Sequence, residues 1–153
     1  MDPLAWFFLI LVLVLVIVIA CLVAKGKRER REREEQENRR RREAKKKEMR
    51  MLKNRVIKMD QDAFKWYSTR IPSNADFVGA FAIHNITKKE WCVESADQVH
   101  DAIKKKLFEI THNVIERQII SIRFVPLLDS GYQNQKALYR AMKEAFVDGE
   151  NEY

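Results

Sequence analysis

The chain opens with an unbroken run of apolar residues, Leu4–Ala24, that contains no charged side chain. A hydrocarbon core about 30 Å thick is crossed by about 20 helical residues. A single segment in lipid must be helical, because every backbone amide has to bond within the segment. Trp6 and Phe7 lie near one end, where aromatic rings suit a membrane interface. The pattern predicts a transmembrane helix over residues 4–24.

A cleaved leader is the alternative explanation of this run. A signal peptide has a basic start, a shorter apolar core and a small-residue cleavage site. Here the start is Met1-Asp2-Pro3, and the basic residues follow the apolar run. The stretch Val18-Ile19-Ala20-Cys21 resembles a bacterial lipobox, which leaves lipidation of Cys21 open. The missing basic start favours an uncleaved span.

A dense cluster of cations follows the apolar run. Cationic flanks stay on the cytoplasmic side, so we expect the N-terminus outside the cell membrane and everything from Lys25 onward in the cytoplasm. These side chains could also contact anionic lipid headgroups, at about 1 kcal/mol each, or nucleic-acid phosphates, or simply form a solvated face. The cluster consists of Lys25, Lys27, Arg28, Arg30, Arg31 and Arg33.

Helix-forming residues dominate the next segment, and we expect a charged helical stem over residues 25–70. Glu precedes a cation by four residues in pairs such as Glu37/Arg41, and each such pair supports a helix by about 0.2–0.5 kcal/mol. The apolar positions late in the stem are spaced 3, 4, 3, 4, 3, which predicts a helix-packing seam and a short coiled coil over 49–66. That stripe could drive self-association or dock on the chain's own C-terminal domain. Its members are Met49, Leu52, Val56, Met59, Ala63 and Trp66.

The remaining apolar pattern predicts a small α+β domain over residues 76–147, followed by a tail over 148–153. Residues 76–85 and 90–94 read as a strand hairpin, and 118–127 as a third strand. Helices are expected over 96–110, capped by Ser95 or Asp97, and over 134–147. The resulting order is β-β-α-β-α. Residues 59–153 carry a net charge of −2, against +10 for residues 25–58, which excludes a uniformly basic nucleic-acid-binding domain.

Several motifs of this domain resemble the GIY-YIG nuclease family. Gly79-Ala80-Phe81 stands at the family's first triad, and Trp91-Cys92-Val93-Glu94-Ser95 at the second. The turn Asp129-Ser130-Gly131-Tyr132 before the last helix is also similar. The resemblance covers about half the chain. It implies a fold that, in the family, cleaves phosphodiesters with a divalent metal held by Glu, tyrosines near the attacking water and an Arg at the phosphate.

The chain departs from the family at each of those roles. No hydroxyl stands at the first tyrosine position, no Arg at the phosphate position and no carboxylate at the metal position, where the nearest one is Glu144. No cofactor is expected, and the spacing of the histidines fits no usual metal motif. We therefore expect no catalytic or metal site. The degenerate positions are Phe81, Trp91, Cys92, Asp101 and Tyr139.

Three functions remain open from the sequence. The first is a single-pass membrane protein whose cytoplasmic, inactive GIY-YIG-like domain binds protein partners. The second is a structural subunit of a membrane secretion, transfer or phage-related assembly, with a homo-oligomer formed through the stem. The third is an active membrane-tethered nuclease that uses Glu144 with His84 or His100. Nucleic-acid binding is not expected of a C-terminal domain with this net charge.

Overall fold

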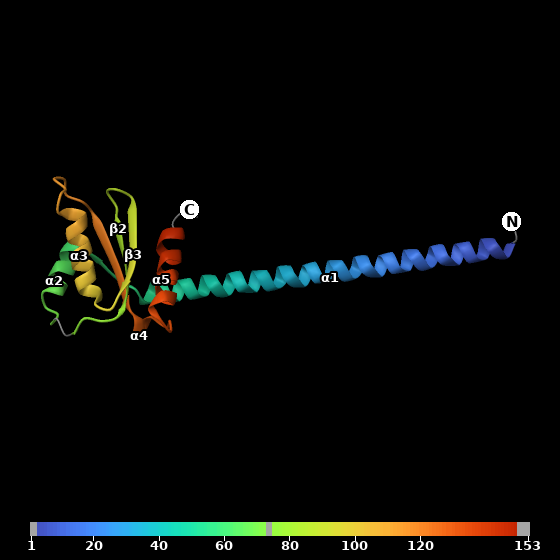
Figure 1. Ribbon diagram of the computed structural model, residues 1–153, viewed down its shortest axis with the longest axis horizontal. Helices are drawn as coiled ribbons and strands as arrows, with labels where there is room; N and C mark the ends of the chain where they lie inside the picture. The colour runs from blue at the N-terminus through green and yellow to red at the C-terminus, as the bar shows by residue number, and fades with distance from the viewer. Residues whose placement is uncertain (1–2, 73–74, 150–153) are drawn as a thin grey trace. The chain divides into compact units, whose positions relative to one another are not determined.

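The computed structural model describes residues 3–72 and 75–149. The chain divides into two compact units, Met1–Lys46 and Lys47–Tyr153. Helix α1 (Pro3–Arg55) makes up the described part of the first unit and continues into the second (Figure 1). The second unit carries the sheet and all the other helices.

The first unit is an exposed helix in which an apolar part is followed by a charged part. Its apolar part is long and apolar enough to cross a membrane, and none of that part is buried within the protein. By length and composition this part is therefore compatible with a single membrane span. The charged part carries exposed ion pairs one helical turn apart, including the predicted pair Glu37–Arg41 at 2.6 Å and Arg28–Glu32 at 3.1 Å.

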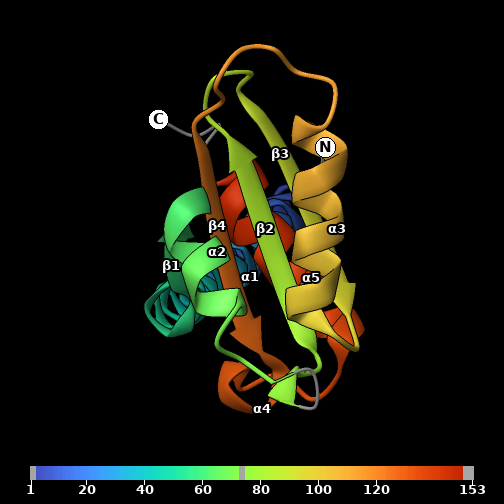
Figure 2. The same cartoon turned by 90° about the vertical axis from the view of Figure 1, so that its left-hand side faces the viewer.

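The second unit is built on an antiparallel sheet, which has four strands within the described residues. In chain order the strands are β1 (Ile57–Asp60), β2 (Gly79–Asn85), β3 (Glu90–Ala96) and β4 (Ile120–Pro126). In space they lie in the order β1-β4-β2-β3 (Figure 2). The central strands β2 and β4 are almost continuously buried, which explains their apolar runs.

Helices cover both faces of this sheet. Figure 2 shows α2 (Gln61–Ser68) and α3 (Val99–Thr111) in front of the strands and α5 (Gln135–Lys143) behind them. A short helix α4 (Leu127–Ser130) precedes α5, and a π-helical turn η2 (Glu144–Asp148) follows it. The α2/α3 face buries Phe64, Phe81, Ile83, Val99, Ile103, Leu107, Ile120, Ile122 and Phe124. The α5 face buries Leu52, Ala80, Ala82, Val125, Leu138, Ala141, Met142, Ala145 and Phe146.

The end of the predicted stem is corrected by the structure. Helix α1 ends at Arg55, the chain then forms β1, and α2 is a separate helix. The carboxylate of Asp60 accepts a hydrogen bond of 2.7 Å from the backbone N–H of Ala63, so a new helix begins there. A single helix over 25–70 is therefore wrong.

The predicted helix-packing seam does not exist as one helical stripe. Met59 belongs to a strand, whereas Ala63 and Trp66 belong to α2. Leu52 is buried in the core of the second unit with 1% exposure, whereas Trp66 is 58% exposed and stacks under the guanidinium of Arg70 at 3.5 Å. The spacing that suggested heptads joins three different elements.

The other predicted elements of the C-terminal domain are present with shifted ends. The first predicted strand starts at Gly79 instead of residue 76, and the first helix starts at Val99 instead of residue 96. The predicted last helix divides into α5 and η2, which takes up Asp148 of the predicted tail. Residues 150–153 of that tail lie outside the described residues. The sequence pattern did not reveal β1 or α4.

Candidate functional site

The family-like positions do not come together in one place. Phe81 is completely buried beneath α2 and α3 and faces the same side of the sheet as Cys92. Trp91 is paired with His84 in the β2–β3 register and lies on the opposite face. Tyr139 belongs to α5, which packs on the face of Trp91. Asp101 is exposed on α3, where it pairs with Lys104 at 3.4 Å.

Gly79, the glycine of the first triad-like motif, has a structural reason to be there. A Cβ at this position would collide with the carbonyl oxygen of Val125 on the neighbouring strand β4. The glycine thus permits close approach of two central strands. Its presence requires no catalytic explanation.

Cys92 is not an activated nucleophile. Its thiol is half-buried and donates a hydrogen bond of 3.4 Å to the carboxylate of Glu94. Burial, followed by the hydrogen bond and the negative charge of Glu94, raises the thiol pKa to about 11. The thiol is therefore protonated at neutral pH and lacks the thiolate that nucleophilic cysteine chemistry needs.

The residues do not fit the divalent cation that the family resemblance implies. The predicted metal position falls at Leu138 and Tyr139, of which Leu138 is fully buried and neither is a carboxylate. Within residues 3–72 and 75–149, no group of three or more His, Cys, Asp or Glu side chains could hold a metal ion. Glu144 lies in η2 on the α5 face, whereas His100 is buried on the α2/α3 face, so these two residues are separated by the sheet.

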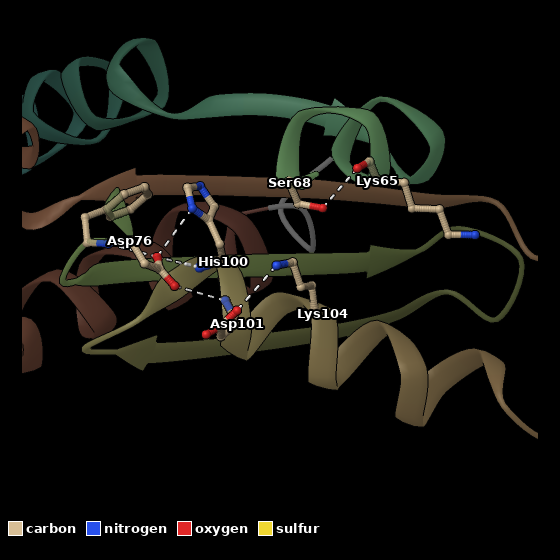
Figure 3. A network of polar contacts seen from close by, with 7 residues as sticks. Lys65, Ser68, Asp76, His100, Asp101 and Lys104 are labelled. Carbon is tan, nitrogen blue, oxygen red and sulfur yellow. Dashed lines mark hydrogen bonds and ion pairs between the residues drawn. The ribbon is translucent and has the colours of Figure 1, made fainter. Parts of the chain in front are cut away.

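A buried carboxylate caps helix α3 from outside the helix. The first carboxylate oxygen of Asp76 accepts hydrogen bonds from the backbone N–H groups of Phe77, at 2.8 Å, and His100, at 2.9 Å. The second accepts one from the N–H of Asp101, at 3.1 Å (Figure 3). Gln98, at the N-cap position, makes no side-chain cap. The predicted caps, Ser95 and Asp97, are therefore wrong.

His100 forms a buried pair with Asp76. Its Nδ1 lies 3.4 Å from the carboxylate, and the two side chains are only 4% and 5% exposed. The imidazole ring contacts the rings of Phe77, Tyr67 and Phe124, with centroids 4.8, 5.3 and 5.6 Å away. The pair is thus enclosed by aromatic side chains. No substrate can reach it without opening the core.

The environment fixes the charge state of this pair. Burial is the largest influence on His100 and lowers its pKa below 6.5, although Asp76 opposes the shift. For Asp76 burial alone would raise the pKa, but the backbone donors, together with His100, lower it below 3.8. At neutral pH the pair is an ionised carboxylate beside a neutral imidazole. The sequence alone could not reveal this pair, because Asp76 and His100 lie 24 residues apart.

The other face of the sheet carries a cavity of about 230 Å³ lined by three cations and two apolar side chains. We call it the basic pocket; its lining residues are Lys53, Val56, Lys58, Arg123 and Phe146. The guanidinium carbon of Arg123 lies 4.7 Å from the ring centroid of Phe146 and 4.8 Å from that of Trp91. The ammonium of Lys53 lies 5.8 Å from the Phe146 ring. His84 stacks on Trp91 with a centroid distance of 4.2 Å and an angle of 4°.

The predicted membrane-surface cations all lie on α1 and are exposed. The basic pocket was missed because its cations come from three separate elements. No spacing along the chain could have joined them.

No family model matches the chain, and comparisons with curated proteins and with solved structures found no significant match. Arguments about function therefore depend on the residues of this chain alone.

Proposed function

We propose that this protein is a single-pass membrane protein whose C-terminal domain is a cytoplasmic, catalytically inactive GIY-YIG-like module that binds protein partners. The observation that carries this proposal is the separation of the family-like positions. Phe81 is buried on one face of the sheet, whereas Trp91 and the helix of Tyr139 lie on the other. Residues divided by a packed sheet cannot act on one phosphodiester.

The chemistry at these positions supports the same conclusion. A phosphodiesterase needs a positioned cation for the phosphate charge and an anionic oxygen ligand for its metal. Asp101 brings a negative charge where a cation is needed, and Phe81 has no hydroxyl. A fold does not imply a function, so the fold can persist after a catalytic site is lost.

The membrane placement rests on the apolar and basic parts of α1. The apolar part is compatible with a single membrane span. The exposed cations after it favour a cytoplasmic position for the rest of the chain. Docking of the predicted stripe on the chain's own domain is favoured over self-association through it, because Leu52 belongs to the core of that domain.

A nuclease assay tests the proposal directly. We expect the purified full-length chain in detergent to leave single- and double-stranded DNA and RNA intact in Mg²⁺ or Mn²⁺. The matched control is Glu144→Gln, which removes the carboxylate nearest the predicted metal position. Cleavage by the wild-type chain that disappears in this variant would establish an active nuclease and overturn the proposal.

Crosslinking in membranes tests the binding role. We expect the intact chain to form crosslinks to another protein that are lost when residues 76–149 are deleted. The same crosslinks should persist when the cations of residues 25–33 are replaced by Gln. Crosslinks that survive deletion of the domain would assign binding to α1 instead.

A further inference from the structure

The charged part of α1 contains two stretches of opposite net charge. Residues 28–37 hold four Arg and five Glu, a net of −1, whereas residues 39–46 hold six cations and one Glu, a net of +5. Every residue of both stretches is exposed on the helix. The first stretch therefore carries its own counter-charges, and the second has only one acidic side chain for six cations.

Three cations of the second stretch lie on one face of the helix. Positions 39, 42 and 46 are spaced by three and four residues, which makes their side chains neighbours on a helix surface, and like charges at this spacing oppose helix formation. Within the described part of the chain, none of the three has an ion pair or a side-chain hydrogen bond, whereas Arg41 pairs with Glu37 and Lys45 also has an interaction. We call these three residues the basic stripe: Arg39, Arg42 and Lys46.

The basic stripe lies beyond the reach of lipid headgroups next to the predicted span. Arg39 follows Ala24 by 15 residues of the continuous helix α1, which is about 22 Å along the helix axis. The headgroup layer adds only about 5–8 Å to each side of the hydrocarbon core. The remaining distance exceeds the Debye length of about 8 Å at physiological salt, and the usual tilt of about 20° changes it little. The stripe therefore faces a ligand away from the membrane surface.

We propose that the basic stripe binds the phosphate backbone of a nucleic acid, without reading its sequence. Double-stranded DNA carries one negative charge per about 1.7 Å of its axis, so the stripe, which spans about 10 Å, meets several phosphates at once. The planar guanidinium groups of Arg39 and Arg42 can each donate two hydrogen bonds to a phosphate. An acidic peptide offers carboxylates to the same groups, but a flexible chain loses entropy when its charges become aligned.

The basic stripe is separate from the part of the chain that resembles a nuclease. It lies in the first compact unit, whereas the family-like residues lie in the second. Binding of a nucleic acid by the stripe therefore requires neither the fold nor the catalytic residues of that family. It adds a second kind of partner to the proposed protein-binding role and does not rest on that role.

Binding of DNA by the full-length chain tests the proposal. The chain in nanodiscs of phosphatidylcholine is titrated against a fluorescently labelled duplex of about 20 base pairs, and anisotropy measures the bound fraction. We expect saturable binding whose affinity falls as salt rises, with a slope of about −2.7 for log K against log salt, because three phosphates are neutralised. An absence of binding at about 50 mM salt would overturn the proposal.

Charge-matched variants locate the binding. The first variant combines Arg39→Gln, Arg42→Gln and Lys46→Gln, and the second replaces the three arginines of residues 30–33 by Gln. All six positions are exposed and Gln is a good helix former, so both variants should keep the helix, which circular dichroism checks. We expect the first to weaken DNA binding at least about tenfold and the second less than about threefold at physiological salt. Equal weakening would overturn the site, because it would show that only the total charge matters.

Two further measurements distinguish a nucleic acid from other polyanions. Poly-glutamate with the same number of charges should bind at least about tenfold more weakly than the duplex. Equal binding would overturn a nucleic-acid ligand in favour of an acidic protein. Nanodiscs with about one third phosphatidylglycerol should lower DNA affinity less than about threefold at physiological salt, because the stripe is distant from the headgroups. Loss of DNA binding in these nanodiscs would overturn the proposal in favour of contact with the membrane.

Discussion

Asp76 and His100 show how burial sets the charge of single residues in this domain. The carboxylate keeps its negative charge because backbone N–H groups stabilise it, and the imidazole stays neutral because its surroundings are aromatic. Both side chains therefore bind protons less readily in the folded chain than in the unfolded chain. Each of the two residues therefore lowers the stability of the folded chain on acidification, and the two effects fall in different pH ranges.

We predict that acidification from pH 7.5 to 5 lowers the melting temperature of the domain through His100. The unfolded chain binds a proton near pH 6.5, whereas the folded chain binds it only at lower pH. The slope contributed by one such group is at most about 1.4 kcal/mol per pH unit. Asp76 contributes stability that is present above pH 3.8 and lost only below that range.

Thermal melts of the full-length chain across this pH range make the measurement. His100→Phe should flatten the pH dependence, because it keeps a ring and removes the titrating group. His112→Gln is the control, since His112 is exposed. A slope that persists in His100→Phe would contradict the assignment.

At the scale of elements, the end of α1 is a structural part of the C-terminal domain. Leu52 is buried in the core of the α5 face. Arg55 donates a hydrogen bond of 2.9 Å to the backbone carbonyl of Ser130. Burial, together with the neighbouring carboxylate of Glu48, raises the pKa of Tyr132 to about 12. The last turns of α1 therefore pack as a core helix does.

We predict that Leu52→Ala lowers the free energy of unfolding of the domain by about 2–5 kcal/mol, because it leaves a cavity in a packed core. Met51→Ala, at the neighbouring position, should change it by less than about 0.5 kcal/mol, since Met51 is 46% exposed. Chemical denaturation of the full-length chain measures both. If Leu52→Ala instead dissociates an oligomer and leaves the free energy of unfolding unchanged, the hypothesis of a self-associating seam would be supported.

An element could be predicted from the sequence where the residues that cause it lie close together along the chain. β2 and β4 were predictable because central strands bury both faces and require an apolar run. β1 was missed because its apolar residues continue the spacing of α1 by coincidence. The cap at Asp60 is a local signal that marks the break. The basic pocket could not be predicted, since the register of Lys58 with Arg123 is set by tertiary packing.

At the scale of the whole molecule, charge is strongly segregated. Residues 25–58 carry a net charge of +10, whereas residues 59–153 carry −2. Because residues 47–58 belong to the folded second unit, that unit carries a net charge of +2 and the exposed residues 25–46 carry +6, so the basic pI of about 9.5 comes mainly from the exposed part of α1. The Lys and Arg side chains of residues 25–33 directly follow the apolar run, and in a membrane protein such a flank favours the cytoplasmic side.

We predict that external protease leaves the C-terminal domain intact in sealed, right-side-out vesicles and removes an epitope tag placed before Met1. Changing the cations of residues 25–33 to Gln and adding lysines before Leu4 should reverse the orientation in a substantial fraction of molecules. Immunoblots against both ends measure the outcome. Digestion of the domain of the unchanged chain from outside would contradict the proposed orientation.

The remote cap of α3 also has a consequence for how the domain folds. Without a side-chain cap of its own, α3 begins with backbone donors that are satisfied only when Asp76 arrives from 24 residues earlier in the chain. Closing that loop costs entropy before the cap can compensate for it. During synthesis Asp76 emerges first, and the β2–β3 hairpin lies between it and the helix. The cap therefore links the start of α3 to the residues that lead into β2, and it can form only when the segment between them has brought Asp76 and His100 together.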